Sequence, residues 1–118
     1  MSSFSISNMY NIHAQENEDP LQIISYIRTL LNQTMTEYKS ANYTGASELI
    51  DIAYIDNYEY IEEPLRELDK ELMEETELLI REDFSNAIND KESSENINNL
   101  YNNILNNLDM IEDQFRKN

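Results

Sequence analysis

"YIDNYEYIEEPLRE", residues 54–67, holds five carboxylates, three tyrosines and one of the two prolines in a chain of 118 residues. Pro64 decides how the helices are divided, because proline has no N–H to donate and its ring clashes with the preceding helical turn. A helix running unbroken from 44 to 90 would be roughly 70 Å long at 1.5 Å per residue, which is too long for so small a domain. We therefore predict a tight turn or strong kink near residues 62–64.

Apolar residues at spacings of three and four on both sides of this turn predict amphipathic helices. Asp19-Pro20 is a helix-start signal, Thr44 can cap a second helix, and Ser93 or Ser94 can cap a last one. Short connections between such helices predict an all-α fold, an antiparallel four-helix bundle. The predicted helices cover about 20–40, 44–62, 64–89 and 94–116.

Length and composition favour one domain with a single modest core. One Gly and two Pro leave few of the turns that a sheet needs. Residues 1–18 lack helical periodicity, so we predict a flexible tail there and a single helical domain over 19–118. "EYKSANYTGASELIDIAY", residues 37–54, resembles one tetratricopeptide unit, but the chain holds no second copy and a repeat array needs several.

The charge restricts the class of partner. The chain carries 24 acidic against eight basic residues, a formal net charge of −16. Nucleic acids and anionic membrane surfaces are disfavoured because binding them needs a basic footprint. The exception is a protein that imitates nucleic acid and blocks a protein that binds it. The predicted partners are cationic: metal ions, basic protein surfaces or amines.

The sequence favours a non-enzymatic function. There is no cysteine, which excludes disulfides, thiolate metal sites and thiol catalysis. The single histidine, His13, lies in the predicted tail, and no glycine-rich phosphate loop is present. A hydrolase with paired carboxylates would need a cleft, which short helices seldom provide. No apolar run approaches the roughly 20 residues of a membrane span.

The N-terminal stretch "NIHAQENEDP", residues 11–20, has two interpretations. Ile12 and Ala14 match the −3 and −1 positions of a secretory cleavage site, and a polar segment follows them. The preceding residues, 2–10, are too short and too polar for the apolar region of a signal peptide. The segment is therefore either a shortened signal sequence or an ordinary disordered tail.

Four carboxylates of the opening stretch form the candidate metal site: Asp56, Glu59, Glu62 and Glu63. Glu59 and Glu62 are three apart on a predicted helix, so their side chains project from neighbouring positions. Like charges at this spacing repel, and a bound cation would reverse that cost. Without imidazole or thiolate the ligands are all oxygen, which suits iron, manganese or calcium.

Two considerations compete with that site. Glu74 and Glu77 form a second Glu-x-x-Glu, but their distances from a turn near 63 do not match those of Glu59 and Glu62, which disfavours a joint site. Glu67 or Glu71 is a better partner for Glu59. Between residues 48 and 83 there are 14 acidic and three basic residues, too many acids for all to be ligands. The alternative interpretation is therefore a solvated acidic face.

Residues 38–83 resemble the extracytoplasmic helical domain attached to membrane permeases of the high-affinity iron (iron/lead) transporter family. The residues that carry the resemblance are Ala53, Tyr54, Asp56, Tyr58, Glu59, Ile61, Glu62 and Leu65, followed by a helix opening at Asp69, Glu71 and Leu72. The permease's membrane helices, with their Arg-Glu-x-x-Glu motif, are absent from this chain. The resemblance implies a secreted, periplasmic or cell-surface accessory domain beside a permease.

Two functions follow from these observations. The first is a non-enzymatic, extracytoplasmic, acidic helical domain that serves as an accessory in metal (iron) handling. The second is an acidic protein-interaction module, or an inhibitor that imitates nucleic acid, docking a basic partner.

Overall fold

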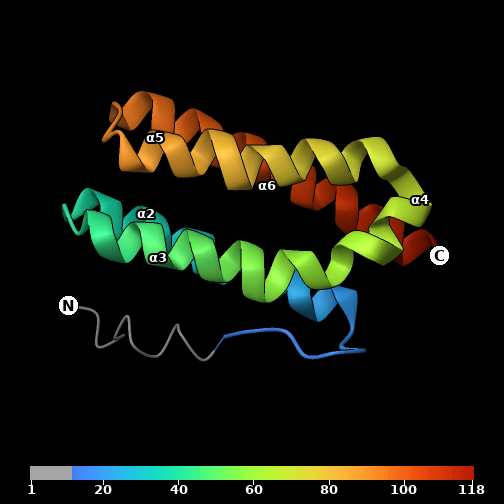
Figure 1. The fold of residues 1–118 in the computed structure, drawn as a ribbon. Helices are drawn as coiled ribbons and strands as arrows, with labels where there is room; N and C mark the ends of the chain where they lie inside the picture. The colour runs from blue at the N-terminus through green and yellow to red at the C-terminus, as the bar shows by residue number, and fades with distance from the viewer. Residues whose placement is uncertain (1–11) are drawn as a thin grey trace.

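The computed structural model describes residues 12–118, and this part of the chain is all-helical, with no strand. The predicted all-α class is confirmed. The elements follow in the order α2 (Pro20–Lys39), α3 (Tyr43–Ala53), π-helix η1 (Tyr54–Tyr58), α4 (Glu59–Leu78), π-helix η2 (Leu79–Phe84), α5 (Ser85–Asn89) and α6 (Ser94–Lys117). They form three helical paths, and the middle path, residues 43–89, folds back on itself (Figure 1).

The fold-back lies at Asp69, not at Pro64. Asp69 has φ −160° and ψ 88°, an extended backbone inside an otherwise helical segment. Its carboxylate accepts a hydrogen bond from the N–H of Leu72 at 3.0 Å, which is the contact of an N-cap residue. The predicted separate helices 44–62 and 64–89 are therefore wrong in their boundary. We call residues 43–68 the first arm and 70–89 the second arm of this helical hairpin.

Pro64 is accommodated inside α4 because it lies on the exposed side of the helix. The carbonyl that loses its partner belongs to Tyr60, which is also exposed, so water can donate to it. On the opposite side Ile61 and Leu65 are fully buried. Burial of such side chains gains about 1.5–3 kcal/mol each, which offsets the roughly 3 kcal/mol that an interior proline costs.

The other helix ends follow local capping signals. The Asp19 carboxylate accepts from the Leu21 N–H, with Pro20 in the first turn, as predicted. Ser93 caps α6 by accepting from the Asn96 N–H. The cap of α3 is Asn42, whose side chain accepts from the Gly45 N–H, so this helix begins one residue before the predicted 44.

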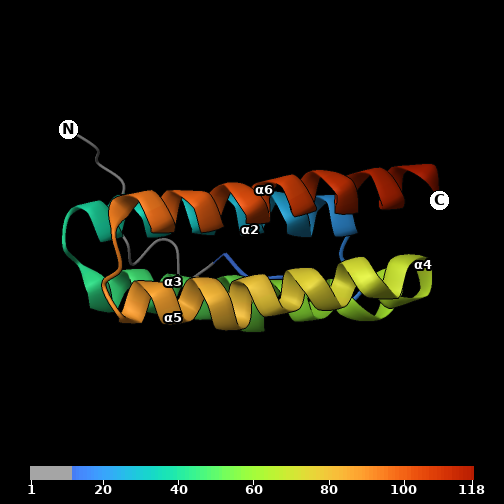
Figure 2. The same ribbon diagram turned by 90° about the horizontal axis from the view of Figure 1, so that it is seen from above.

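The core lies between the helical paths. Helix α2 packs against α3 and also against α6, and α6 runs alongside the second arm (Figures 1 and 2). The apolar stripes of all these elements meet in one cluster. The side chains in it that are fully buried include Ile24, Ile27, Leu30, Leu31, Leu49, Tyr58, Ile61, Leu65, Phe84, Ile104 and Leu108.

The predicted flexible tail covers residues 1–18, of which 1–11 lie outside the described residues. Its last part runs along the first arm (Figure 1). The Ala14 N–H donates to the Asp56 carbonyl at 2.8 Å, and the Asn57 amide donates to the Ile12 carbonyl at 3.0 Å. Ala14 is buried, whereas His13 is exposed.

Substitutions at Pro64 and Asp69 test which residue divides the hairpin. Pro64→Ala restores a helical N–H, so we expect it to raise the free energy of unfolding by about 1–3 kcal/mol. Asp69→Ala removes the N-cap and should lower that free energy by about 1 kcal/mol, while Asp69→Asn keeps a capping oxygen and should cost less. Urea unfolding followed by circular dichroism measures all three; a destabilised Pro64→Ala protein would instead make the proline the dividing residue.

Candidate functional site

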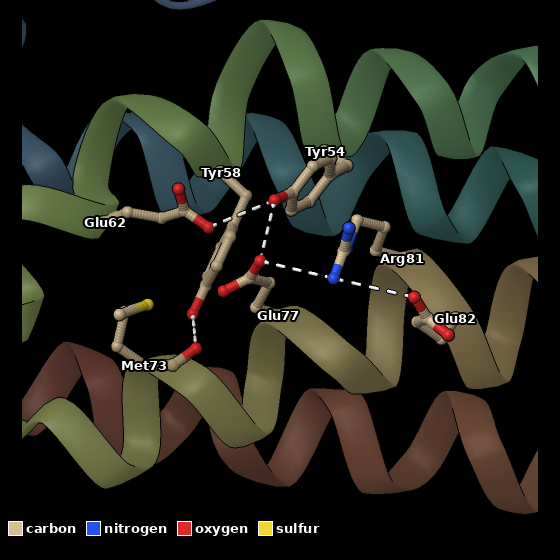
Figure 3. Close-up of polar contacts among 7 residues, drawn as sticks. All are labelled: Tyr54, Tyr58, Glu62, Met73, Glu77, Arg81 and Glu82. Carbon is tan, nitrogen blue, oxygen red and sulfur yellow. Dashed lines mark hydrogen bonds and ion pairs between the residues drawn. The ribbon is translucent and has the colours of Figure 1, made fainter.

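The four predicted metal ligands do not point to one place. Glu63 is exposed and pairs with Arg66 at 2.6 Å, and Glu59 is exposed at the rim of a hollow of about 280 Å³. Asp56 is half-buried in η1. Glu62 turns toward Glu77 of the second arm (Figure 3). Within residues 12–118, no group of three or more histidine, cysteine, aspartate or glutamate residues is arranged to hold a metal ion.

Glu62 belongs instead to a polar cluster with Tyr54 and Glu77. The Tyr54 hydroxyl lies 3.2 Å from Glu62 Oε2 and 3.2 Å from Glu77 Oε2 (Figure 3). Glu62 precedes the fold-back at Asp69 by about as many residues as Glu77 follows it, so the two face each other across the hairpin. A turn near residue 63, as predicted from the sequence, disfavours this pairing; the fold-back at Asp69 brings it about.

The cluster is short of hydrogen-bond donors. A tyrosine has one hydroxyl proton and can donate it to only one carboxylate at a time. Glu62 and Glu77 therefore share one hydroxyl proton between them. Burial raises the pKa of Glu62, and the negative charge of Glu77 raises it further. The pKa of Tyr54 is also raised, by burial and by both carboxylates, so the phenol keeps its proton.

Arg81 supplies the positive charge at the edge of the cluster. Its guanidinium lies 3.6 Å from Glu77 Oε2 and 3.5 Å from Glu82 Oε2 (Figure 3). The guanidinium is about half exposed, and an ion pair of this kind is worth roughly 0.2–1 kcal/mol. Arg81 therefore compensates Glu77 only in part and leaves the pair of carboxylates with excess negative charge.

The buried ring of Tyr58 packs against the cluster, and its hydroxyl links the two arms. Its ring stacks on Tyr54, with centroids 6.1 Å apart, and its hydroxyl donates to the Met73 carbonyl at 2.8 Å. Tyr58 is fully buried, and burial raises its pKa. Its role is structural: it fixes the distance between the arms at which Glu62 and Glu77 can both reach Tyr54.

Two π-helical segments flank the cluster. Tyr54 begins η1, and Arg81 lies within η2 on the facing arm. Such segments occur frequently at functional sites, because the wider turn re-aims the side chains around it. In η1 the side-chain amide nitrogen of Asn57 donates to the Ile52 carbonyl at 3.0 Å. The Asn57 side-chain oxygen is buried and accepts no hydrogen bond from the described residues.

Comparison of the chain with protein families, with curated proteins and with solved structures finds no match. The resemblance to the iron-permease-associated domain therefore stays a prediction. In the part of the chain that the structure describes, no helix has both the length and the apolar character needed to cross a bilayer.

The raised pKa of Glu62 predicts a pH-dependent stability. The pKa of Glu62 in the folded protein exceeds the ordinary value of 4.5. Above pH 4.5 the unfolded chain therefore releases this proton more readily than the folded protein does. As a result, the free energy of unfolding falls as the pH rises from 4.5 through the folded pKa. Glu62→Gln removes this fall. We expect the variant to be more stable than the wild type at pH 7 by about 0.5 kcal/mol, and the difference to vanish below pH 4.5.

Urea unfolding at a series of pH values measures this difference. Glu67→Gln is the matched control, because Glu67 lies on the same helix but is exposed. If stability depended on pH in the same way in Glu62→Gln and in the wild type, the raised pKa would not belong to Glu62.

Proposed function

We propose that this domain is a non-enzymatic binding module whose acidic surface docks a basic protein partner. The observation that carries the proposal is the excess of exposed carboxylates without counter-charges along the hairpin. Glu67, Glu71, Glu74 and Asp83 are exposed, and none of them forms an ion pair with another of the described residues. A surface of this kind attracts cationic partners and repels nucleic acid.

We propose that the fold which carries this acidic surface is an antiparallel four-helix bundle. Its four helices are α2, the two arms of the hairpin and α6. Helices held together by a continuous core present their outer faces in a fixed geometry. The acids of the second arm would therefore meet a partner without an ordering cost for the backbone, which favours affinity.

Binding to a labelled lysine-rich peptide tests the proposal, measured by fluorescence anisotropy. We expect saturable binding at about 50 mM salt that weakens about tenfold at about 300 mM, because salt screens exposed charges. A glutamate-rich peptide of the same length and a duplex DNA should not bind. Absence of binding to the basic peptide at low salt would refute the proposal.

An inhibitor that imitates nucleic acid would act on the same electrostatic principle, by occupying the basic site of a protein that binds nucleic acid. It is distinguished by competition: it would displace duplex DNA from such a protein, whereas a general interaction module would leave that complex intact.

Metal handling is a second proposal, and it rests on the pair Glu62 and Glu77. Their mutual repulsion raises the pKa of Glu62, and a bound cation would remove that cost. Calorimetric titration with Fe³⁺, Mn²⁺ and Ca²⁺ tests it. The proposal requires saturable binding at or below about 100 μM that Glu62→Gln abolishes and Glu67→Gln retains. A location outside the cytoplasm, beside a permease, stays a prediction of the family resemblance.

A further inference from the structure

Two hollows lie end to end along the line where the second arm meets α6. The first, of about 490 Å³, is lined by Leu72 and Glu75 on one side and by Met110 and Gln114 on the other. The second, of about 440 Å³, is lined by Leu78 and Leu79 and by asparagines of α6. Glu75 borders both, so the hollows are neighbours, and together we call them the α4–α6 groove.

The wall between the two hollows is fixed by hydrogen bonds. Asn107 is buried in α6, and its amide donates to Glu75 Oε1 at 3.3 Å and to Thr76 Oγ1 at 3.1 Å. Thr76 in turn donates to the Leu72 carbonyl at 2.8 Å. The shape of the groove is thus set by contacts inside the domain, before any partner arrives.

Apolar side chains protrude where the groove is open to solvent. Leu78 is 49% exposed and Met110 is 46% exposed, two of the four large apolar side chains that the described residues expose to this extent. Each lines a different hollow. Methionine adapts its shape to different apolar partners, which suits a docking surface.

The border of the groove is acidic. Among the described residues, Lys117 is the only basic one that lines either hollow. The acidic residues that line them are Asp69, Glu71, Glu75, Asp83 and Asp113. The lining of the groove therefore combines apolar with acidic side chains, and its complement is an apolar stripe accompanied by lysine or arginine.

We propose that the α4–α6 groove binds an amphipathic, basic α-helix of a partner protein. Leu72 and Leu79, one in each hollow, are seven residues apart, which is about 10.5 Å along a helix. A partner helix lying along the groove would reach both hollows with apolar residues at positions i and i+7, and those at i+3 and i+4 would cover the wall between them. This inference rests on the proposed function and names the partner's chemistry and the place where it docks.

Two labelled peptides of identical composition test the inference. Both contain leucine, lysine and alanine; in the first the leucines form one helical stripe with an i, i+7 spacing, and in the second they are distributed around the helix. We expect the first peptide to bind about tenfold more tightly, measured by fluorescence anisotropy. Leu78→Ser and Met110→Ser should each weaken that binding several-fold.

Ile55→Ser is the matched control, because Ile55 is 54% exposed but lines a different hollow, beside Arg81. It should leave the affinity unchanged. Backbone amide shifts of the wild-type protein in NMR spectra give a second readout that needs no substitution: on adding the first peptide they should change at Leu78, Asn106 and Met110.

The outcomes separate this inference from the proposed function. If both peptides bind equally and the serine variants bind as tightly as the wild type, the acidic module stands and the groove is refuted. If neither peptide binds, both are refuted. If sedimentation of the protein alone reveals a dimer that Leu78→Ser dissociates, the groove holds a second copy of the chain and the inference is overturned.

Discussion

The hydrogen bond from the Leu72 N–H to the Asp69 carboxylate caps the second arm of the hairpin at the residue where the first arm ends. Its position in the sequence decides which residues of the arms face each other. With the fold-back at Asp69, Glu62 and Glu77 meet at Tyr54, and Tyr58 reaches the carbonyl of Met73. A fold-back a few residues earlier would bring different side chains together and would also shift the acidic border of the α4–α6 groove along α6.

The helix ends that depend on local chemistry were predictable from the sequence. Asp19 and Ser93 act as caps where the sequence places them, because a cap involves only residues two or three apart. Pro64 misled the prediction because the cost of an interior proline depends on exposure, which the local sequence does not give. Asp69, followed by Lys-Glu-Leu, was the better signal: a capping residue with Glu71 in the first turn after it.

The polar cluster was predictable only in part. Glu62 was among the candidate residues, whereas Tyr54 was named only for the family resemblance and Glu77 was disfavoured as a partner. Pairing across the hairpin requires the position of the turn, so an error there removes the partner of Glu62. The α4–α6 groove was beyond sequence reasoning, since it depends on how α6 is rotated against the second arm. The acidic residues thus occupy two environments. Glu62 and Glu77 lie close together between the two arms, whereas other acidic residues line the open α4–α6 groove.

Asn107 also decides which side of α6 faces inward. The helix carries pairs of asparagines one turn apart, at 98–99, 102–103 and 106–107, and their amides are nearly interchangeable in water. Burial makes them unequal, because a buried amide without a partner costs roughly 1–3 kcal/mol. Thr76 and Glu75 supply partners at a single position along the second arm. A helix that is poor in intrinsic helix formers thus adds one matched buried amide to the apolar stripe of Ile97, Ile104, Leu108 and Ile111, and a rotation of α6 would leave that amide without its partners.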